Sequence, residues 1–249
     1  MSDPLLHTQG LTKCFGAVQA CNNLSLSIAP GEIHALIGPN GAGKTTLLNQ
    51  ISGDLKPDAG RIYFDGREIT RQPLYRRAHL GLARSYQITS LFKRLTVEEN
   101  FLLAIQVHRG HSFRFWKNAA DDSRLRNLIS PAIEQMGLAE RAKLLAGRLS
   151  HGEQRQLEVG MALAGNPKLL LLDEPMAGMG PGGAVELSKL ILKLKQRVSI
   201  LLVEHDMEAI FALADRITVL VYGEVLITGT PREIRADPQV RQAYLGDEI

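Results

Sequence analysis

Short apolar runs alternate with segments of helical periodicity along much of the chain. Four runs contain mostly Leu, Ile, Val and Ala, and they span residues 33–37, 169–172, 199–203 and 217–221. Helical patterns follow the first three of them, at residues 44–52, 184–196 and 207–214. A short run that is apolar at every position predicts a strand covered by helices on both faces. The alternation therefore predicts an α/β fold with a largely parallel sheet.

Two regions depart from this alternation. Residues 61–64 end at an Asp-Gly turn pair and predict an antiparallel strand in the first third of the chain. From about residue 97 to residue 146 no strand is predicted, and apolar residues such as Ile133 and Met136 recur at helical spacing. We expect an α/β core with an antiparallel part, formed by residues 1–88 and 159–249, and an inserted helical subdomain at residues 89–158.

Composition and charge narrow the classes of function. A chain of 249 residues has room for one domain, and 29 basic against 26 acidic residues give a net charge of only +3. Nucleic-acid-binding proteins concentrate basic charge on one face, so no nucleic-acid partner is expected. No apolar run approaches the roughly 18–20 residues that cross a bilayer, and no secretory signal is visible. Cys14 and Cys21 have no companions at zinc-binding spacing and are expected to be reduced thiols.

A phosphate-binding loop lies between the first apolar run and the helical pattern after it. The segment fits the pattern G-x-x-x-x-G-K-[ST] and reads Gly38-Pro39-Asn40-Gly41-Ala42-Gly43-Lys44-Thr45, followed by Thr46. The glycines let backbone N–H groups point at a phosphate chain, and the helix adds its positive N-terminal end. Lys44 can reach the β- and γ-phosphates, and the Thr45 hydroxyl can bind Mg²⁺. The sequence therefore predicts a nucleoside triphosphate site.

Two carboxylates follow the second apolar run. Asp173 and Glu174 come directly after residues 169–172, and ligands bind where the strands of a parallel sheet end. Asp173 is expected to hold Mg²⁺ through water, and Glu174 to orient or deprotonate an attacking water. The alternative interpretation is a strand that ends in an acidic turn before Pro175.

A further segment, Leu149-Ser150-His151-Gly152-Glu153-Gln154, predicts the start of a helix. Ser150 and Glu153 have the spacing of a capping box, and the helix is expected to run through Leu163. A capped helix N-terminus can also bind an anion, so the structural and functional interpretations are compatible.

Together these three segments resemble the ATP-binding cassette (ABC) ATPases, whose signature usually reads Leu-Ser-Gly-Gly-Gln. Ser150 and Gly152, which approach phosphate in that family, are present, whereas His151 and Glu153 depart from it and Glu153 brings a negative charge. The resemblance implies a P-loop NTPase with a RecA-like core, an antiparallel β subdomain and an inserted α-helical subdomain, which uses ATP and Mg²⁺.

The resemblance also assigns roles to single residues. It implies that Phe15 stacks on adenine, although a plain core phenylalanine is the alternative. Gln87 matches the glutamine that senses Mg²⁺ and water, which implies that Gln87 is a further metal ligand. His205 matches the switch histidine that contacts the γ-phosphate and, with Glu174, performs hydrolysis. Gly180 ends the D-loop at a position where Asp or Asn is common, which weakens any side-chain contact across a dimer there.

Partners follow from the same resemblance. In this family the signature helix of one subunit completes the P-loop site of another, which implies a homodimer or a heterodimer with a sister cassette. ATP-driven closure would reach two transmembrane permease subunits through the groove near Gln87, with a periplasmic binding protein as an indirect partner. The expected location is peripheral, at the cytoplasmic face of the inner membrane.

Finer features resemble the larger ATPase subunit of branched-chain amino acid importers. They are the segments at residues 84–87, 91–92 and 173–180, the tail from Gly229, and a long helical segment at 106–126 with an aromatic and basic cluster at 113–117. Importers of urea, other amides or carboxylates share the pattern, and the lipopolysaccharide-export ATPase has a similar tail. A non-transport ABC ATPase acting on DNA or ribosomes is a more distant alternative, because such chains usually carry two cassettes or long coiled-coil insertions.

Overall fold

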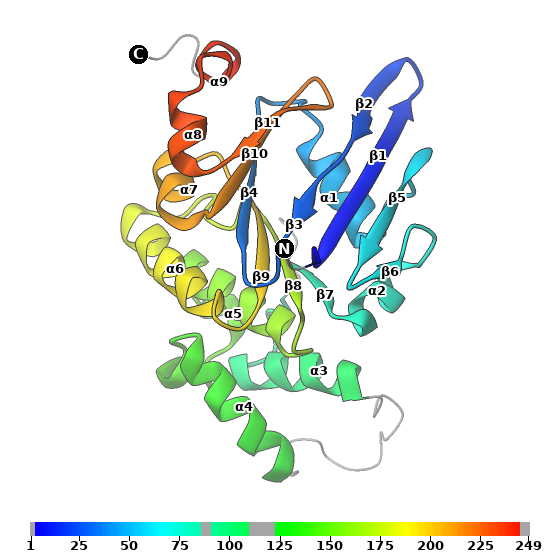
Figure 1. Ribbon diagram of the computed structural model, residues 1–249. Helices are drawn as coiled ribbons and strands as arrows, with labels where there is room; N and C mark the ends of the chain where they lie inside the picture. Colours follow the sequence, from blue (N-terminus) through cyan, green and yellow to red (C-terminus); the bar gives the residue numbers. More distant parts are fainter. Residues whose placement is uncertain (1–2, 86–90, 110–122, 245–249) are drawn as a thin grey trace.

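The computed structural model describes residues 3–85, 91–109 and 123–244, and within them the strands form two sheets (Figure 1). The larger, six-stranded sheet consists of β4 (Ile33–Ile37), β7 (Leu82–Ser85), β8 (Leu169–Asp173), β9 (Ser199–Val203), β10 (Arg216–Val221) and β11 (Glu224–Gly229). Its spatial order is β11-β10-β4-β9-β8-β7. All neighbours pair in parallel except β11, which is antiparallel to β10. The predicted parallel α/β core is confirmed.

The smaller sheet is antiparallel and contains β1 (Leu6–Phe15), β2 (Val18–Leu24), β3 (Ser27–Ile28), β5 (Ala59–Phe64) and β6 (Arg67–Glu68). Among these strands, only β5 is predicted from the sequence. In β1 and β2 polar residues interrupt the apolar ones, and the register between the two strands shifts twice. Such irregular pairing leaves no clean two-residue alternation from which a strand could be predicted.

Nine helices occur in the described residues. They are α1 (Lys44–Ser52), α2 (Leu74–Leu80), α3 (Val97–Arg109), α4 (Ser123–Gln135), α5 (His151–Leu163), α6 (Pro181–Leu194), α7 (Met207–Leu213), α8 (Pro231–Ala236) and α9 (Pro238–Tyr244), with short 3₁₀ turns η2 (Ala139–Arg141) and η3 (Ala146–Arg148). The predicted helix at residues 44–52 agrees with α1. Helix α6 begins three residues earlier than predicted, because Pro181 occupies its first position, where the fixed φ of proline favours a helix.

Helices cover both faces of the larger sheet, as the apolar runs predict. Along β9, Ile200 and Leu202 pack into a core shared with α3, α4, α5 and α6. Leu201 and Val203 pack on the opposite face, against α1 and the antiparallel sheet. Figure 1 shows α3 and α4 below the sheets, α6 to α8 along the left flank, and β1, β2 and β5 on the right. The central strands are therefore fully enclosed, and their ends alone reach the surface.

Helices α3, α4 and α5 all come between β7 and β8 in the chain. No strand occurs in the described residues between 97 and 146, in agreement with the helical pattern there. The limits of the inserted subdomain, at residues 89 and 158, stay a prediction. In the part of the chain that the structure covers, no helix is both long and apolar enough to cross a bilayer.

The two cysteines are both free thiols. Cys14 is exposed, whereas Cys21 is buried beside Gln50, whose Nε2 lies 3.2 Å from its sulfur. Burial raises the pKa of the Cys21 thiol to about 11, so this group stays protonated at neutral pH.

Gly160 brings α5 into close contact with α3. A Cβ at Gly160 would lie 2.4 Å from Cζ of Phe101 and 2.7 Å from Cγ of Met136, and both neighbouring side chains are buried. We predict that Gly160→Ala lowers the free energy of unfolding by about 1–3 kcal/mol, because the added methyl group overpacks this interface. Urea denaturation measures the change.

Gly182 provides the matched control, because it lies in α6 and a Cβ there meets open space. Gly182→Ala should leave the free energy of unfolding unchanged or raise it by up to about 1 kcal/mol through helix propensity. A Gly160→Ala variant as stable as the wild type would contradict tight packing between α3 and α5.

Candidate nucleotide-binding site

Three neighbouring strands of the larger sheet end at one edge and bring most of the predicted site together. The phosphate-binding loop follows β4, His205 follows β9, and β8 ends with Asp173. Their register places Leu36 of β4 and Asp173 of β8 on either side of Val203 in β9. Because all three strands are parallel, the groups that follow them meet at their carboxyl ends, where α/β proteins bind ligands.

The geometry of the phosphate-binding loop requires glycine at two positions. A Cβ at Gly38 would lie 2.2 Å from the carbonyl oxygen of Leu220, and one at Gly43 would lie 2.2 Å from that of Ala20. Gly43 also has a φ of +100° and is the residue that precedes the first turn of α1. Only glycine combines this backbone conformation with such close approach. The N-terminus of α1, with its unpaired N–H groups, is thereby held at the end of the loop.

Lys44 is buried at the start of α1, and its ammonium group folds back over the loop. Its Nζ donates hydrogen bonds to the carbonyl oxygens of Gly38 at 2.7 Å and Pro39 at 3.1 Å. Burial lowers the pKa of Lys44, and the nearby carboxylates of Glu174 and Asp173 oppose that shift. The loop and the acidic end of β8 are therefore close enough to interact electrostatically.

Asp173 has one engaged and one unengaged carboxylate oxygen. Oδ2 accepts a hydrogen bond from Nη2 of Arg84 at 3.0 Å, and among the described residues Oδ1 has no hydrogen-bond partner. Burial raises the pKa of Asp173, while the charge of Arg84 and its hydrogen bond act in the opposite direction. A buried carboxylate oxygen without a partner suits a metal ion or a metal-bound water. The residues here fit a divalent cation.

Glu174 and His205 lie against each other at the surface end of the site. His205 Nε2 and Glu174 Oε1 are 2.5 Å apart, and both side chains are partly exposed. The Glu174 N–H donates to the carbonyl oxygen of Val203 at 2.8 Å, and the Glu174 backbone has a φ of +47°. This left-handed conformation costs on the order of 1 kcal/mol in a residue that is not glycine, and such strain gathers at functional sites.

Glu204, a residue that the sequence does not mark as functional, supports this pair. Its buried carboxylate accepts hydrogen bonds from the N–H groups of Met176 at 2.7 Å and His205 at 3.0 Å. Burial raises the pKa of Glu204, and these two hydrogen bonds partly compensate. Glu204 thus joins the loop after β8 to the loop after β9. The sequence feature that could have revealed Glu204 is its position as a third carboxylate directly after an apolar strand. That feature is not distinctive, because an ordinary exposed strand end also carries a charged residue.

The capping box of the signature segment is confirmed at the start of α5. The Ser150 hydroxyl accepts from the Glu153 N–H at 3.3 Å, and Glu153 Oε2 accepts from the Ser150 N–H at 2.8 Å. The other carboxylate oxygen of Glu153 accepts from Nε of Arg141 at 2.8 Å. These contacts lower the pKa of Glu153, with the Arg141 hydrogen bond as the largest cause. The negative charge that Glu153 brings to the signature is therefore paired with Arg141.

The remaining residues named from the sequence lie at the surface, at a helix start, or outside the described part of the chain. Phe15 ends β1 with 51% of its surface exposed and is therefore not a core residue, with Lys13 Nζ 5.6 Å from its ring centroid. Thr45 is exposed in the first turn of α1. Asp206 caps α7, where its carboxylate accepts from the N–H groups of Glu208 and Ala209. Gln87 and the aromatic and basic cluster at 113–117 lie outside the described residues.

The fold and this sheet edge define a P-loop nucleotide-binding protein, and comparison with known proteins narrows the class. A family described as "ABC transporter" matches residues 21–177, and one described as "Branched-chain amino acid ATP-binding cassette transporter" matches residues 224–249. This chain belongs to the ABC transporter ATP-binding proteins, a family of ATPases.

Individual relatives agree with this placement. The high-affinity branched-chain amino acid transport ATP-binding protein BraF of Pseudomonas aeruginosa is 39% identical over 99% of this chain and 100% of that protein. The corresponding protein LivG of Salmonella typhimurium is 41% identical with the same coverage. Among solved structures, MJ1267, an ATP-binding cassette of an ABC transporter, superposes with a TM-score of 0.87 at 30% identity, covering 98% of this chain and 99% of that one.

The pairing of Glu153 with Arg141 predicts a pH-dependent contribution to stability. Glu153→Gln keeps the hydrogen-bond acceptor of the capping box but removes the charge. Because the folded-state pKa of Glu153 is lowered, its stabilising effect is complete above the unfolded pKa near 4.3 and is lost as the pH falls below it. The variant should be less stable than the wild type by about 0.5–1 kcal/mol at pH 7. The difference should shrink progressively as the pH falls from the unfolded pKa through the lowered folded-state pKa.

Thermal unfolding of both proteins between pH 3 and pH 8 measures this difference. Glu140→Gln serves as the control, because Glu140 is exposed next to Arg141, and it should change stability by less than about 0.5 kcal/mol. A Glu153→Gln deficit that stays constant over the whole pH range would contradict the ion-pair explanation.

Proposed function

We propose that this chain is the ATP-hydrolysing subunit of a transporter that imports branched-chain or related amino acids. The observation that carries the proposal is the Glu174–His205 pair beside a phosphate-binding loop, in a chain that resembles BraF and LivG over its full length. The tail supports the choice of substrate class, because residues 224–249 match the branched-chain amino acid family.

In the proposed mechanism the loop residues bind ATP, and Mg²⁺ completes the site. The loop from Gly38 to Thr46 holds the phosphates through its N–H groups, with Lys44 on the β- and γ-phosphates and Phe15 against the adenine. Thr45, Asp173 and Gln87 would hold Mg²⁺, which would supply positive charge to offset that of the phosphates. The partnerless oxygen of Asp173 and the exposed ring of Phe15 support these roles.

Hydrolysis depends on the Glu174–His205 pair. Glu174 orients the attacking water and accepts its proton, while His205 contacts the γ-phosphate. In the structure the two side chains bond to each other at 2.5 Å. We infer that nucleotide binding exchanges this bond for one between His205 and the γ-phosphate, and that the exchange frees the Glu174 carboxylate for water. Glu204 keeps both backbone segments in place during the exchange.

The assembly follows from the incomplete site of a single cassette. Ser150, His151, Gly152 and Glu153 begin α5 and contribute to the ATP site of a second cassette, identical or related. The dimer contacts two permease subunits at the cytoplasmic face of the inner membrane, and the cassette is peripheral there. Residues 89–158 form the helical subdomain that receives this contact. A periplasmic binding protein delivers the solute.

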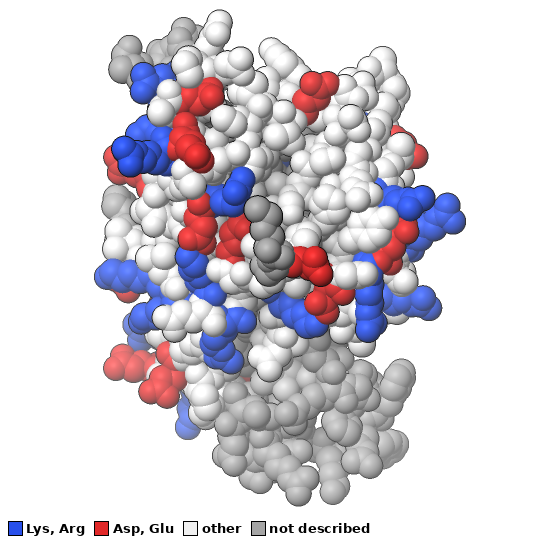
Figure 2. All heavy atoms as spheres, in the orientation of Figure 1, with Lys and Arg blue, Asp and Glu red and all other residues white. Residues whose placement is uncertain are grey.

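Two alternatives, lipopolysaccharide export and a nucleic-acid partner, have less support than amino-acid import. The lipopolysaccharide export system ATP-binding protein LptB of Haemophilus influenzae is 33% identical over 98% of each chain, below the identity of BraF and LivG. A nucleic-acid partner would need a concentrated basic face. Figure 2 shows Lys and Arg interspersed with Asp and Glu on the described part of the visible face. Amino-acid import therefore has the stronger support.

Glu174→Gln tests the hydrolytic role of the carboxylate. The variant should bind ATP within a few-fold of the wild type but hydrolyse it about 10²-fold or more slowly, because it cannot accept a proton. An ATP-dependent dimer should accumulate on size-exclusion chromatography. Glu186→Gln, at an exposed ion pair on α6, is the control and should keep wild-type turnover. Wild-type turnover in Glu174→Gln would refute the assigned role.

The substrate class is tested by reconstituting this chain in liposomes with candidate permease subunits and a candidate binding protein. Leucine, isoleucine or valine, presented with the binding protein, should stimulate ATP hydrolysis several-fold, whereas urea should not. ATPase activity that responds to lipopolysaccharide, or to no amino acid, would exclude amino-acid import while leaving the ATPase assignment intact.

A further inference from the structure

We propose that Arg84 is a positioning residue for ATP hydrolysis, which orients the metal-binding carboxylate of Asp173 and joins it mechanically to the far end of α1. The inference rests on the proposed ATPase function and concerns Arg84, to which neither the motifs nor the comparisons assign a role.

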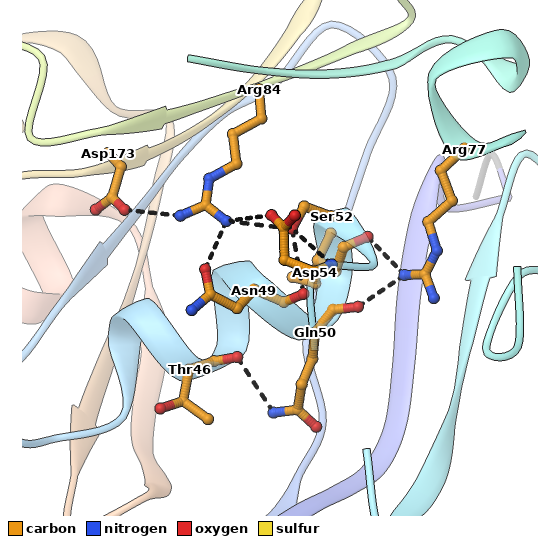
Figure 3. A network of polar contacts seen from close by, with 9 residues as sticks. Thr46, Asn49, Gln50, Ser52, Asp54, Arg77, Arg84 and Asp173 are labelled. Carbon is orange, nitrogen blue, oxygen red and sulfur yellow. Dashed lines mark hydrogen bonds and ion pairs between the residues drawn. The ribbon is translucent and has the colours of Figure 1, made fainter. Parts of the chain in front are cut away.

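The guanidinium of Arg84 forms hydrogen bonds both to Asp173 and to residues at the end of α1 (Figure 3). Its side chain is 7% exposed, on β7 beside β8. Nη2 donates to Oδ2 of Asp173 at 3.0 Å. Nη1 contacts three oxygens from the end of α1 and the turn after it, which belong to Asn49 at 2.6 Å, Ser52 at 3.2 Å and Asp54 at 3.1 Å. One planar group thus spans from the last turn of α1 to the acidic end of β8.

This arrangement restricts the Asp173 carboxylate. Because Arg84 occupies Oδ2, the remaining oxygen, Oδ1, is the one without a partner among the described residues. The donors of a guanidinium have a fixed planar geometry, so the carboxylate cannot rotate freely while both sides are bonded. Arg84 therefore presents a single oxygen of Asp173 to the metal and acts on the site through that carboxylate.

The same contacts connect the metal ligand to the phosphate-binding loop. Helix α1 begins with Lys44 and Thr45, which the proposed function places on phosphate and metal, and it ends with Asn49 and Ser52 near Arg84. A helix of nine residues is a rigid body about 13 Å long. A displacement of α1 when phosphate binds at one end would reach Asp173 through Arg84 at the other end.

A second arginine contacts the same turn and offers a matched control. Arg77 on α2 is buried, and its Nη1 donates to the carbonyl oxygens of Gln50 and Ile51, both at 2.7 Å (Figure 3). Its other hydrogen bonds go to the carbonyl oxygens of Gln72 and Thr70. Arg77 thus stabilises the end of α1 without a hydrogen bond to Asp173.

The experiment compares wild type, Arg84→Lys, Arg84→Met and Arg77→Lys. It measures Mn²⁺ affinity in the presence of ATP by electron paramagnetic resonance, the Mg²⁺ midpoint of ATP hydrolysis, and ATP affinity in EDTA. Lysine keeps the charge at position 84 but cannot bridge both partners. We expect both Arg84 variants to weaken Mn²⁺ binding and raise the Mg²⁺ midpoint by about 10-fold or more, as for other groups that orient metal ligands. Metal-free ATP affinity should stay within about twofold of wild type.

Arg77→Lys should lower the thermal midpoint and leave Mn²⁺ affinity unchanged. Asn49→Ala removes one α1 partner of Arg84 and should shift Mn²⁺ affinity in the same direction, by a smaller factor; this variant decides the question if the Arg84 variants do not fold. Unchanged or tighter Mn²⁺ binding in Arg84→Lys, or an equal loss in Arg77→Lys, would overturn the proposal. A wild type that binds Mn²⁺ and ATP without hydrolysis would refute the proposed function, and the Mn²⁺ affinities would still decide the role of Arg84.

Discussion

The burial of three parallel strands on both faces is the constraint on which the rest of this structure depends. In β8 and β9 successive side chains enter two separate cores, one shared with α3 to α6 and one with α1 and the antiparallel sheet. In β4, Ala35 and Ile37 instead enter a third core, which contains residues of α7, α8 and α9. In strands enclosed in this way a polar group needs a buried partner, as His34 of β4 has in Glu32 and Thr218, whereas a strand end can also use water. The phosphate-binding loop, Asp173 with Glu174, and His205 share the edge of the larger sheet at which these strands end.

At that edge, burial and polar partners shift the pKa values of the charged groups in opposite directions. Burial raises the pKa values of Asp173 and Glu204 and lowers that of Lys44, while Arg84, backbone N–H groups and the two carboxylates near Lys44 oppose these shifts. Charges so placed are held in defined orientations, because each buried polar atom needs a particular partner. Preorganised groups of this kind stabilise a transition state without having to reorient during the reaction.

The elements that could be predicted from the sequence are those with a clear local pattern, such as an uninterrupted apolar run or a helical spacing of apolar residues. The strand at residues 33–37 and the helix at 44–52 agree with β4 and α1, because an apolar run, a glycine loop and a helical pattern follow each other directly. Strands β1, β2, β7 and β11 were missed, since their polar or partly exposed residues leave no clean period. Their pairing comes from distant partners, such as β8 for β7, which no local pattern contains.

The sequence by itself determined the features whose contacts span only a few residues. The glycines of the phosphate-binding loop and the capping box of Ser150 and Glu153 are of this kind, and both follow from local backbone geometry. Only the tertiary structure decided the contacts between distant segments. Arg84 and Asp173 are 89 positions apart, and Glu174 and His205 are 31 apart. The order of strands in the sheet brings these residues together, and the packing of both sheet faces sets that order.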